Sequence, residues 1–139
     1  MEITANALQT VASNQNVLFT DTPVPGNYSI MHRDGSGLVS IRGVTQQCRA
    51  RYRVSFGGNI ALPADGAAGP ISVAIAVNGE AVAPTTMIVT PTATEAFFNV
   101  FSAIFLDVPS GCCSQISVKN TSEVAIDVQN ANLIVERVA

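Results

Sequence analysis

Residues 97–108 read Phe-Phe-Asn-Val-Phe-Ser-Ala-Ile-Phe-Leu-Asp-Val, and no other stretch constrains the architecture as strongly. Successive side chains of a β-strand point to opposite faces of the sheet. One face would carry Phe97, Asn99, Phe101, Ala103, Phe105 and Asp107, and the other Phe98, Val100, Ser102, Ile104, Leu106 and Val108. A sheet that meets water on one side is normally polar on that side. A strand that is largely apolar on both sides therefore predicts that both of its faces are covered.

The rest of the chain, followed outward from this stretch, is a series of short alternating runs separated by turns. Residues 49–56 and 71–77 alternate most clearly, and Asn78-Gly79 predicts a tight hairpin because both residues tolerate positive φ. The strand over residues 49–56 is expected to continue over residues 59–62, after a bulge or close approach at Gly57-Gly58. Further strands are expected over residues 17–20, 38–42, 85–90, 116–119, 124–128 and 133–138, with a turn at Asn130. No stretch has the spacing of an amphipathic helix, so the sequence predicts an all-β antiparallel sandwich of about 8–10 strands.

The composition indicates one domain that covers part of its surface by self-association. The chain has 139 residues and a mass of 14.5 kDa, with 47% of its residues hydrophobic and only 12% charged. A monomer of this size exposes roughly 6,900 Å², so its charges are spaced at about one per 400 Å², which is sparse for a free monomer. The apolar content excludes a disordered chain, and no uncharged apolar run approaches the ~18 residues of a membrane span. The net charge of −3 argues against nucleic acid as a partner.

The first residues differ from the rest of the chain. Residues 1–16 are mostly small and polar, and we interpret them as an N-terminal arm, with residues 17–139 forming the sandwich domain. The start has neither the basic nor the apolar region of a secretion signal. We therefore expect the chain in a reducing bacterial cytoplasm before release, or in a virion after lysis.

The two-sided strand predicts how copies of the chain associate. If Phe97, Phe101 and Phe105 point outward, they form an apolar patch of several hundred Å², which monomers rarely expose. Covering such a patch favours association by several kcal/mol at about 25 cal/mol per Å², before entropic costs. The sequence predicts a tight homo-oligomer whose interface contains Phe97, Phe101, Phe105, Asn99 and Ala103. The alternative is that loops or the N-terminal arm bury both faces within one monomer.

The strongest polar feature is a ladder of arginines on one face of the strand over residues 49–56. Arg49, Arg51 and Arg53 would form an anion-binding stripe for glycan carboxylates, phosphate or an acidic partner surface. Because like charges on one face repel, the alternative is that acidic residues of neighbouring strands or subunits pair with them. The candidate partners are Asp107, Glu136 and Asp127.

No group of residues predicts catalysis, a metal or a cofactor. The single histidine, His32, lies beside a turn and is expected on the surface, and no nucleophile signature or nucleotide-binding fingerprint occurs. Three cysteines fit no closed disulfide framework. We interpret Cys112 and Cys113 as small, partly buried apolar residues after a turn.

The order of short strands resembles a known family. The paired-face strand 97–108, the turn Pro109-Ser110-Gly111, the run 71–80 and the closing run 132–137 together resemble the tumour-necrosis-factor-like jelly roll, which complement globular-head domains share. The chain is also similar to small jelly-roll proteins encoded by phages and prophages of gut Firmicutes. The resemblance implies a jelly-roll sandwich that forms a compact homotrimer around an aromatic axis. No collagen-like stalk precedes the domain, which argues against an animal extracellular ligand.

These observations predict a non-catalytic protein with two possible roles. The first is a structural module of a phage or prophage particle, a trimeric head decoration or fibre domain that residues 1–16 attach to a larger assembly. The alternative is an attachment module that binds a cell-surface glycan or protein through loops 21–36, 63–70 or 91–96, since loops commonly carry binding residues.

Overall fold

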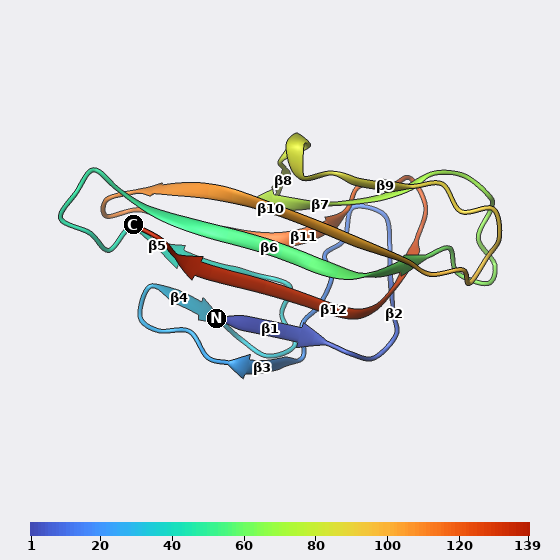
Figure 1. Ribbon diagram of the computed structural model, residues 1–139, viewed down its shortest axis with the longest axis horizontal. Helices are drawn as coiled ribbons and strands as arrows, with labels where there is room; N and C mark the ends of the chain where they lie inside the picture. The colour runs from blue at the N-terminus through green and yellow to red at the C-terminus, as the bar shows by residue number, and fades with distance from the viewer.

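The computed structural model describes residues 1–139 and is a sandwich of two antiparallel sheets (Figure 1). Sheet A has the order β10-β6-β12-β1-β3, with β2 beside β12, and sheet B has the order β4-β5-β11-β7-β8, with β9 beside β7. In sheet A the strands are β1 (Glu2–Ala5), β2 (Gln9–Val11), β3 (Asp21–Val24), β6 (Arg49–Ala61), β10 (Phe98–Pro109) and β12 (Ile126–Arg137). In sheet B they are β4 (Ile30–His32), β5 (Val39–Arg42), β7 (Ile71–Val77), β8 (Glu80–Ala81), β9 (Met87–Val89) and β11 (Cys113–Asn120). The predicted all-β antiparallel sandwich is confirmed, and its only helical turn is η1 (Ala83–Thr85).

The core lies between the sheets because each strand turns one set of alternating side chains inward. A cluster of 27 buried hydrophobic residues fills it. Phe19 and Phe56 meet edge to face, with ring centroids 6.5 Å apart, and the buried Tyr52 donates its hydroxyl hydrogen to the carbonyl of Arg42. The chain exposes 7023 Å², close to the surface expected for a monomer of this mass. No helix in the structure has the length and apolarity needed to span a membrane.

Residues 1–16 contribute strands β1 and β2 to sheet A, so this segment packs on the sandwich and does not extend from it as an arm. Strand β1 pairs with β12 on one side and with β3 on the other, and Ile3 is fully buried in the core. The alternation over residues 2–5 is too short to stand out in the sequence, and its pairing partner β12 lies at the other end of the chain. Residues 17–20, predicted as the first strand, form no strand, although Val17 and Phe19 are fully buried.

Of the bulge or close approach predicted at Gly57 and Gly58, the structure has the close approach on β6, and the bulge lies opposite on β12. Strand β6 runs through Gly57 and Gly58 without a break, and the register shifts on β12 between Gln129 and Asn132. Asn130, with a φ of 53°, is the bulge residue. The two strands expected on either side of it are therefore the single strand β12.

The hairpin at Asn78 and Gly79 is confirmed, with φ values of 53° and 85°. The return segment differs from the prediction, because β8, η1 and β9 replace one continuous strand over residues 85–90. Twelve strands result, of which β2, β4, β8 and β9 have three residues or fewer.

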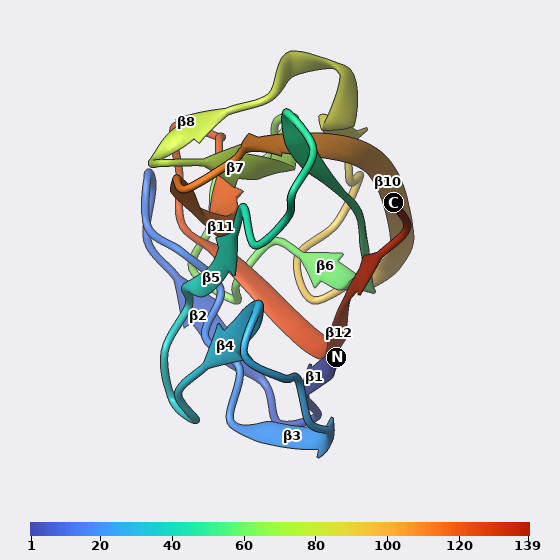
Figure 2. The same ribbon diagram turned by 90° about the vertical axis from the view of Figure 1, so that its left-hand side faces the viewer.

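The candidate binding loops lie at two different ends of the sandwich. Loops 63–70 and 91–96 lie together at the right-hand end of Figure 1, where the amide of Glu95 donates to the carbonyl of Leu62 at 2.8 Å. The loop over residues 25–29 lies at the other end, beside the loop over residues 43–48 and the turn after β10, and Figure 2 looks onto that end. The loops 21–36, 63–70 and 91–96 therefore form no single binding edge.

Candidate functional site

The most distinctive surface is the outward side of β10, the edge strand of sheet A. Its outward residues Asn99, Phe101, Ala103 and Phe105, together with Phe97 directly before the strand, form what we call the aromatic strip, and all five are exposed. The exposed fractions of the three phenylalanines are 40% for Phe97, 63% for Phe101 and 61% for Phe105. Large aromatic side chains aligned at such exposure form a surface that association would cover.

The inward side of β10 packs on the core. Val100 and Val108 are buried, and Ile104 and Leu106 are partly buried against the hydrophobic cluster. One chain therefore covers one of the two apolar faces of this strand, except at its first residue Phe98, which is exposed. The alternative that loops or the N-terminal residues bury both faces within a monomer is wrong, because no segment of the chain lies over the aromatic strip.

The apolar surface continues from β10 toward the centre of sheet A. Phe101 lies opposite Gly57 of β6, and a Cβ added at Gly57 would lie 3.7 Å from the Phe101 ring. Beyond β6, the outward residue Ile134 of β12 is also exposed. Because Gly57 has no side chain, the amide end of Asn132 on β12 reaches the space beside the Phe101 ring, and its Oδ1 would lie 2.9 Å from a Cβ at Gly57.

A charged cluster adjoins the aromatic strip at the end of sheet A where β10 terminates. Asp107 accepts hydrogen bonds from Arg51 Nε at 2.8 Å on Oδ1 and from Arg51 Nη2 at 3.1 Å on Oδ2, and Arg49 Nε lies 3.0 Å from the same Oδ2. Arg53 Nη1 donates to Glu136 Oε1 at 3.4 Å. The arginine ladder thus has acidic partners on the neighbouring strands β10 and β12 of the same chain.

The electrostatics of this cluster follow from the bidentate pair. The hydrogen bond from Arg51 holds the pKa of Asp107 below its ordinary value, and the charges of Arg51 and Arg49 act in the same direction against the effect of partial desolvation. The same hydrogen bond raises the pKa of Arg51. The third predicted acid, Asp127, instead accepts a hydrogen bond from Thr10 at 2.8 Å. Anion binding by Arg49, Arg51 and Arg53 stays a prediction.

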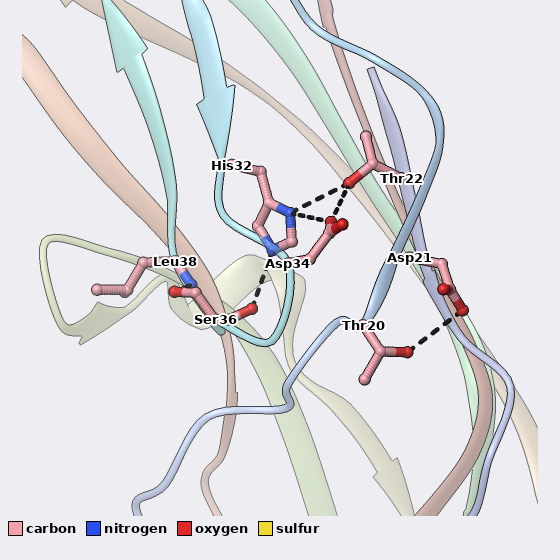
Figure 3. A network of polar contacts seen from close by, with 7 residues as sticks. All are labelled: Thr20, Asp21, Thr22, His32, Asp34, Ser36 and Leu38. Atoms are coloured by element: carbon pink, nitrogen blue, oxygen red, sulfur yellow. Dashed lines mark hydrogen bonds and ion pairs between the residues drawn. The ribbon is translucent and has the colours of Figure 1, made fainter.

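His32 is not on the surface, which corrects the expectation (Figure 3). Its fully buried ring places Nε2 3.0 Å from the carbonyl of Ser36 and Nδ1 3.5 Å from the hydroxyl of Thr22. The Thr22 hydroxyl gives its hydrogen to Asp34 at 2.6 Å rather than to the ring. This network joins β3 of sheet A to β4 of sheet B along one seam of the sandwich.

The cysteines are all free and exposed, so the interpretation of Cys112 and Cys113 as partly buried residues is wrong. No three of the histidine, cysteine, aspartate and glutamate side chains come together as metal ligands would.

One pair of residues has no counterpart in the sequence prediction. The guanidinium of Arg42 lies 5.0 Å from the ring centroid of Tyr28, and 69% of Tyr28 is exposed. The two residues lie in segments 14 positions apart, and no spacing rule connects them. Only the pairing of β4 with β5 brings these segments together.

Comparison with known proteins supports the fold. No protein-family profile matches the sequence, and no curated protein matches it. The globular domain of zebrafish complement 1qA protein matches with a TM-score of 0.55 at 10% identity, over 96% of this chain and 93% of that one. Murine APRIL matches with a TM-score of 0.59 at 9% identity, over 95% of this chain and 96% of that one. The chain therefore has the jelly-roll fold of the tumour-necrosis-factor and complement-globular-head type.

Proposed function

We propose that this chain is a non-catalytic binding module that assembles as a homotrimer through the aromatic strip. The observation that carries the proposal is the outward exposure of Phe97, Phe101 and Phe105 on the edge strand of a sheet whose other face is already packed. The expected trimer of the resembling family supports the same assembly.

The energetics favour an interface larger than the strip alone. The three phenylalanines together leave about 300 Å² of ring surface exposed, and covering it would contribute about 8 kcal/mol at 25 cal/mol per Å². Association costs about 4–15 kcal/mol in lost translational and rotational freedom. Stable interfaces bury about 800 Å² on each partner, so the contact must continue over β6 and β12. The surface around Gly57 and the exposed Ile134 supply that continuation.

The position of β10 at the edge of sheet A suits a ring of copies. The edge strand of one copy can pack against the face of the next, which is a head-to-tail contact that closes into a ring when the rotation fits. The number three comes from the resemblance, because the geometry of one chain does not specify how many copies close the ring.

The assembly is tested by the mass of the full chain in solution. Light scattering after size-exclusion chromatography, at micromolar concentration, should give three times the 14.5 kDa chain mass. Phe101→Asp should shift the mass to that of one chain, because it places a charge in the centre of the interface. A wild-type monomer would overturn the proposal.

A matched control keeps this test specific. Ile88 on β9 of sheet B is 68% exposed, close to the exposure of Phe101, and lies outside the proposed interface. Ile88→Asp should therefore leave the trimer intact. If Ile88→Asp dissociates the assembly while Phe101→Asp does not, sheet A is not the interface.

The biological setting stays a prediction. In a phage or prophage particle the trimer would be a head decoration or fibre module, and capsid genes beside its gene would support that role. The attachment role of residues 1–16 needs a revised form, because β1 is paired on both sides and offers no free backbone edge. A cell-surface attachment role agrees equally with a trimer.

A further inference from the structure

A second feature lies at the end of the sandwich that Figure 2 views. A cavity of about 350 Å³ opens between the loop after β5, the turn after β10 and the loop before β4. Tyr28, Arg42, Val44, Gly111, Cys112 and Cys113 line it. Its volume is within the range of small-molecule sites. The cavity lies away from the aromatic strip on β10.

Backbone hydrogen bonds hold the cavity in a fixed shape. The amide of Gly43 donates to the carbonyl of Cys112 at 2.8 Å, and the amide of Gly111 donates to the carbonyl of Gly43 at 3.0 Å. A Cβ at Gly43 would lie 2.0 Å from the carbonyl oxygen of Pro109, so only glycine permits this approach. A ligand would therefore find the site formed and would not bear the cost of ordering it.

Arg42 and Tyr28 are also anchored through their backbones. The amide of Arg42 donates to the carbonyl of Ser29 at 3.0 Å, and its carbonyl accepts the hydrogen bond from buried Tyr52. The side chain of Asn27 accepts hydrogen bonds from the amide of Ser29 at 2.9 Å and from its hydroxyl at 2.8 Å. The segment that carries Tyr28 is thus fixed while the ring itself stays exposed.

Arg42 supplies the charged group of this cavity. Arg49, Arg51 and Arg53 each have an acidic partner within the chain, whereas Arg42 has none. A guanidinium offers a planar fork of donors that fits a carboxylate. The exposed ring of Tyr28 and the exposed side chain of Val44 add an apolar platform beside that fork. The site therefore suits a molecule that has both a carboxylate and a ring with an apolar face.

We propose that this cavity binds the carboxylate-bearing sugar unit of a glycan, with the carboxylate on Arg42 and the C–H face of the sugar ring against Tyr28 and Val44. An inorganic anion could bind Arg42 but would make no contact with the apolar surface of Tyr28 and Val44. A peptide strand finds no free edge here, because β5 is paired with β4 on one side and β11 on the other. The inference rests on the proposed role as a binding module, and a homotrimer would present three equivalent sites whose avidity exceeds that of one.

The exposed thiols provide a direct readout. Methyl glucuronide bound to the full chain should slow the alkylation of Cys112 and Cys113 by iodoacetamide several-fold. Mass spectrometry of samples taken over time measures the alkylation rate of each cysteine. Cys48 is exposed but does not line the cavity, so its alkylation rate should not change. Methyl glucoside, the same sugar without the carboxylate, should give no protection.

Substitutions of Arg42 and Tyr28 test whether these two side chains bind the sugar. Arg42→Gln and Tyr28→Ala should each weaken methyl glucuronide binding by about tenfold or more, because each removes one half of the recognition. Arg33→Gln is the matched control, since Arg33 is an exposed arginine that also lacks an acidic partner and lies outside the cavity. Its binding should equal that of the wild type.

Three results would overturn the inference: no protection of Cys112 and Cys113, equal protection by methyl glucoside, or equal protection by N-acetylglutamate, a carboxylate without a sugar ring. The wild-type comparison of sugars applies even if a variant fails to fold. Light scattering on the same sample separates the two proposals, because a trimer without sugar binding refutes only this site, and a monomer that binds the sugar refutes only the assembly.

Discussion

Strands β6 and β10 are neighbours of almost equal length with opposite surroundings. They pair continuously, from Phe98 opposite Ile60 to Pro109 opposite Arg49. Strand β6 has a partner on each side, its inward Tyr52 and Phe56 are fully buried, and its outward arginines have acidic partners. Strand β10 lies at the edge, and its outward phenylalanines are exposed.

The difference shows which part of the molecule is complete in one chain. Residues of the same chain pair with every outward charge of β6 and bury every aromatic ring on its inward side. For β10, the same chain buries most of the inward side and leaves the outward phenylalanines exposed. An exposed Phe101 contributes little to the stability of a single chain, so its contribution belongs to association.

The largest expected effect comes from the core of β6. Phe56→Ala should lower the free energy of unfolding by about 3–5 kcal/mol, because it removes a fully buried ring that packs on Phe19. Urea denaturation measures the change. Phe101→Ala should alter the unfolding free energy of dilute protein much less, and should instead remove the dependence of unfolding on protein concentration. Equal losses for both variants would remove the distinction between the two strands.

An intermediate effect distinguishes the two adjacent glycines of β6. A Cβ at Gly58 would lie 3.3 Å from both the Cα of Ala131 and the ring of Phe56, so one of them must move by a few tenths of an ångström, and Gly58→Ala should cost about 1–3 kcal/mol. A Cβ at Gly57 meets the flexible side-chain end of Asn132 at 2.9 Å, so Gly57→Ala should cost less. Thermal unfolding of the two variants compares them directly. The reverse order would mean that the outward face of β6 is packed as tightly as the inward face.

The smallest expected effect concerns the ion pairs that join β6 to β10. Because Arg51 lowers the pKa of Asp107, the pair stabilises the folded chain above the ordinary carboxyl range, and this stabilisation is lost as the pH falls through the lowered pKa. Asp107→Asn should therefore flatten the loss of stability below about pH 4. Denaturation midpoints across acidic pH measure this. Glu123→Gln, at an exposed residue without an ion pair, should leave the acid dependence unchanged, and an unaltered curve for Asp107→Asn would show that the pair contributes nothing.

Much of the fold was predictable because strand alternation is local. The alternation over residues 49–56, 71–77 and 97–108 predicted β6, β7 and β10 to within a few residues, and the expected continuation of β6 over residues 59–62 ends at Ala61. The repulsion within the arginine ladder predicted acidic partners on neighbouring strands, and Asp107 and Glu136 fill that role. The short strand β1 and the bulge at Asn130 were missed because their conformations depend on partners far along the chain.

The candidate sites were predictable to different degrees. The aromatic strip follows from sequence alone, since residues two apart on a strand share a face. The burial of His32 and the stacking of Arg42 on Tyr28 do not, because each joins segments that only sheet pairing or sheet packing brings together.

The order of residues determined that the chain is a β-sandwich and that the strand over residues 97–108 is apolar on both sides, because the pleat of a strand fixes the direction of each side chain locally. The tertiary structure decided that this strand lies at the edge of a sheet with Phe101 and Phe105 outward, and that Arg42, which has no acidic partner, lies beside the ring of Tyr28. Strand order and charge pairing depend on contacts between segments that are far apart in the sequence, so they cannot be worked out from any one segment alone.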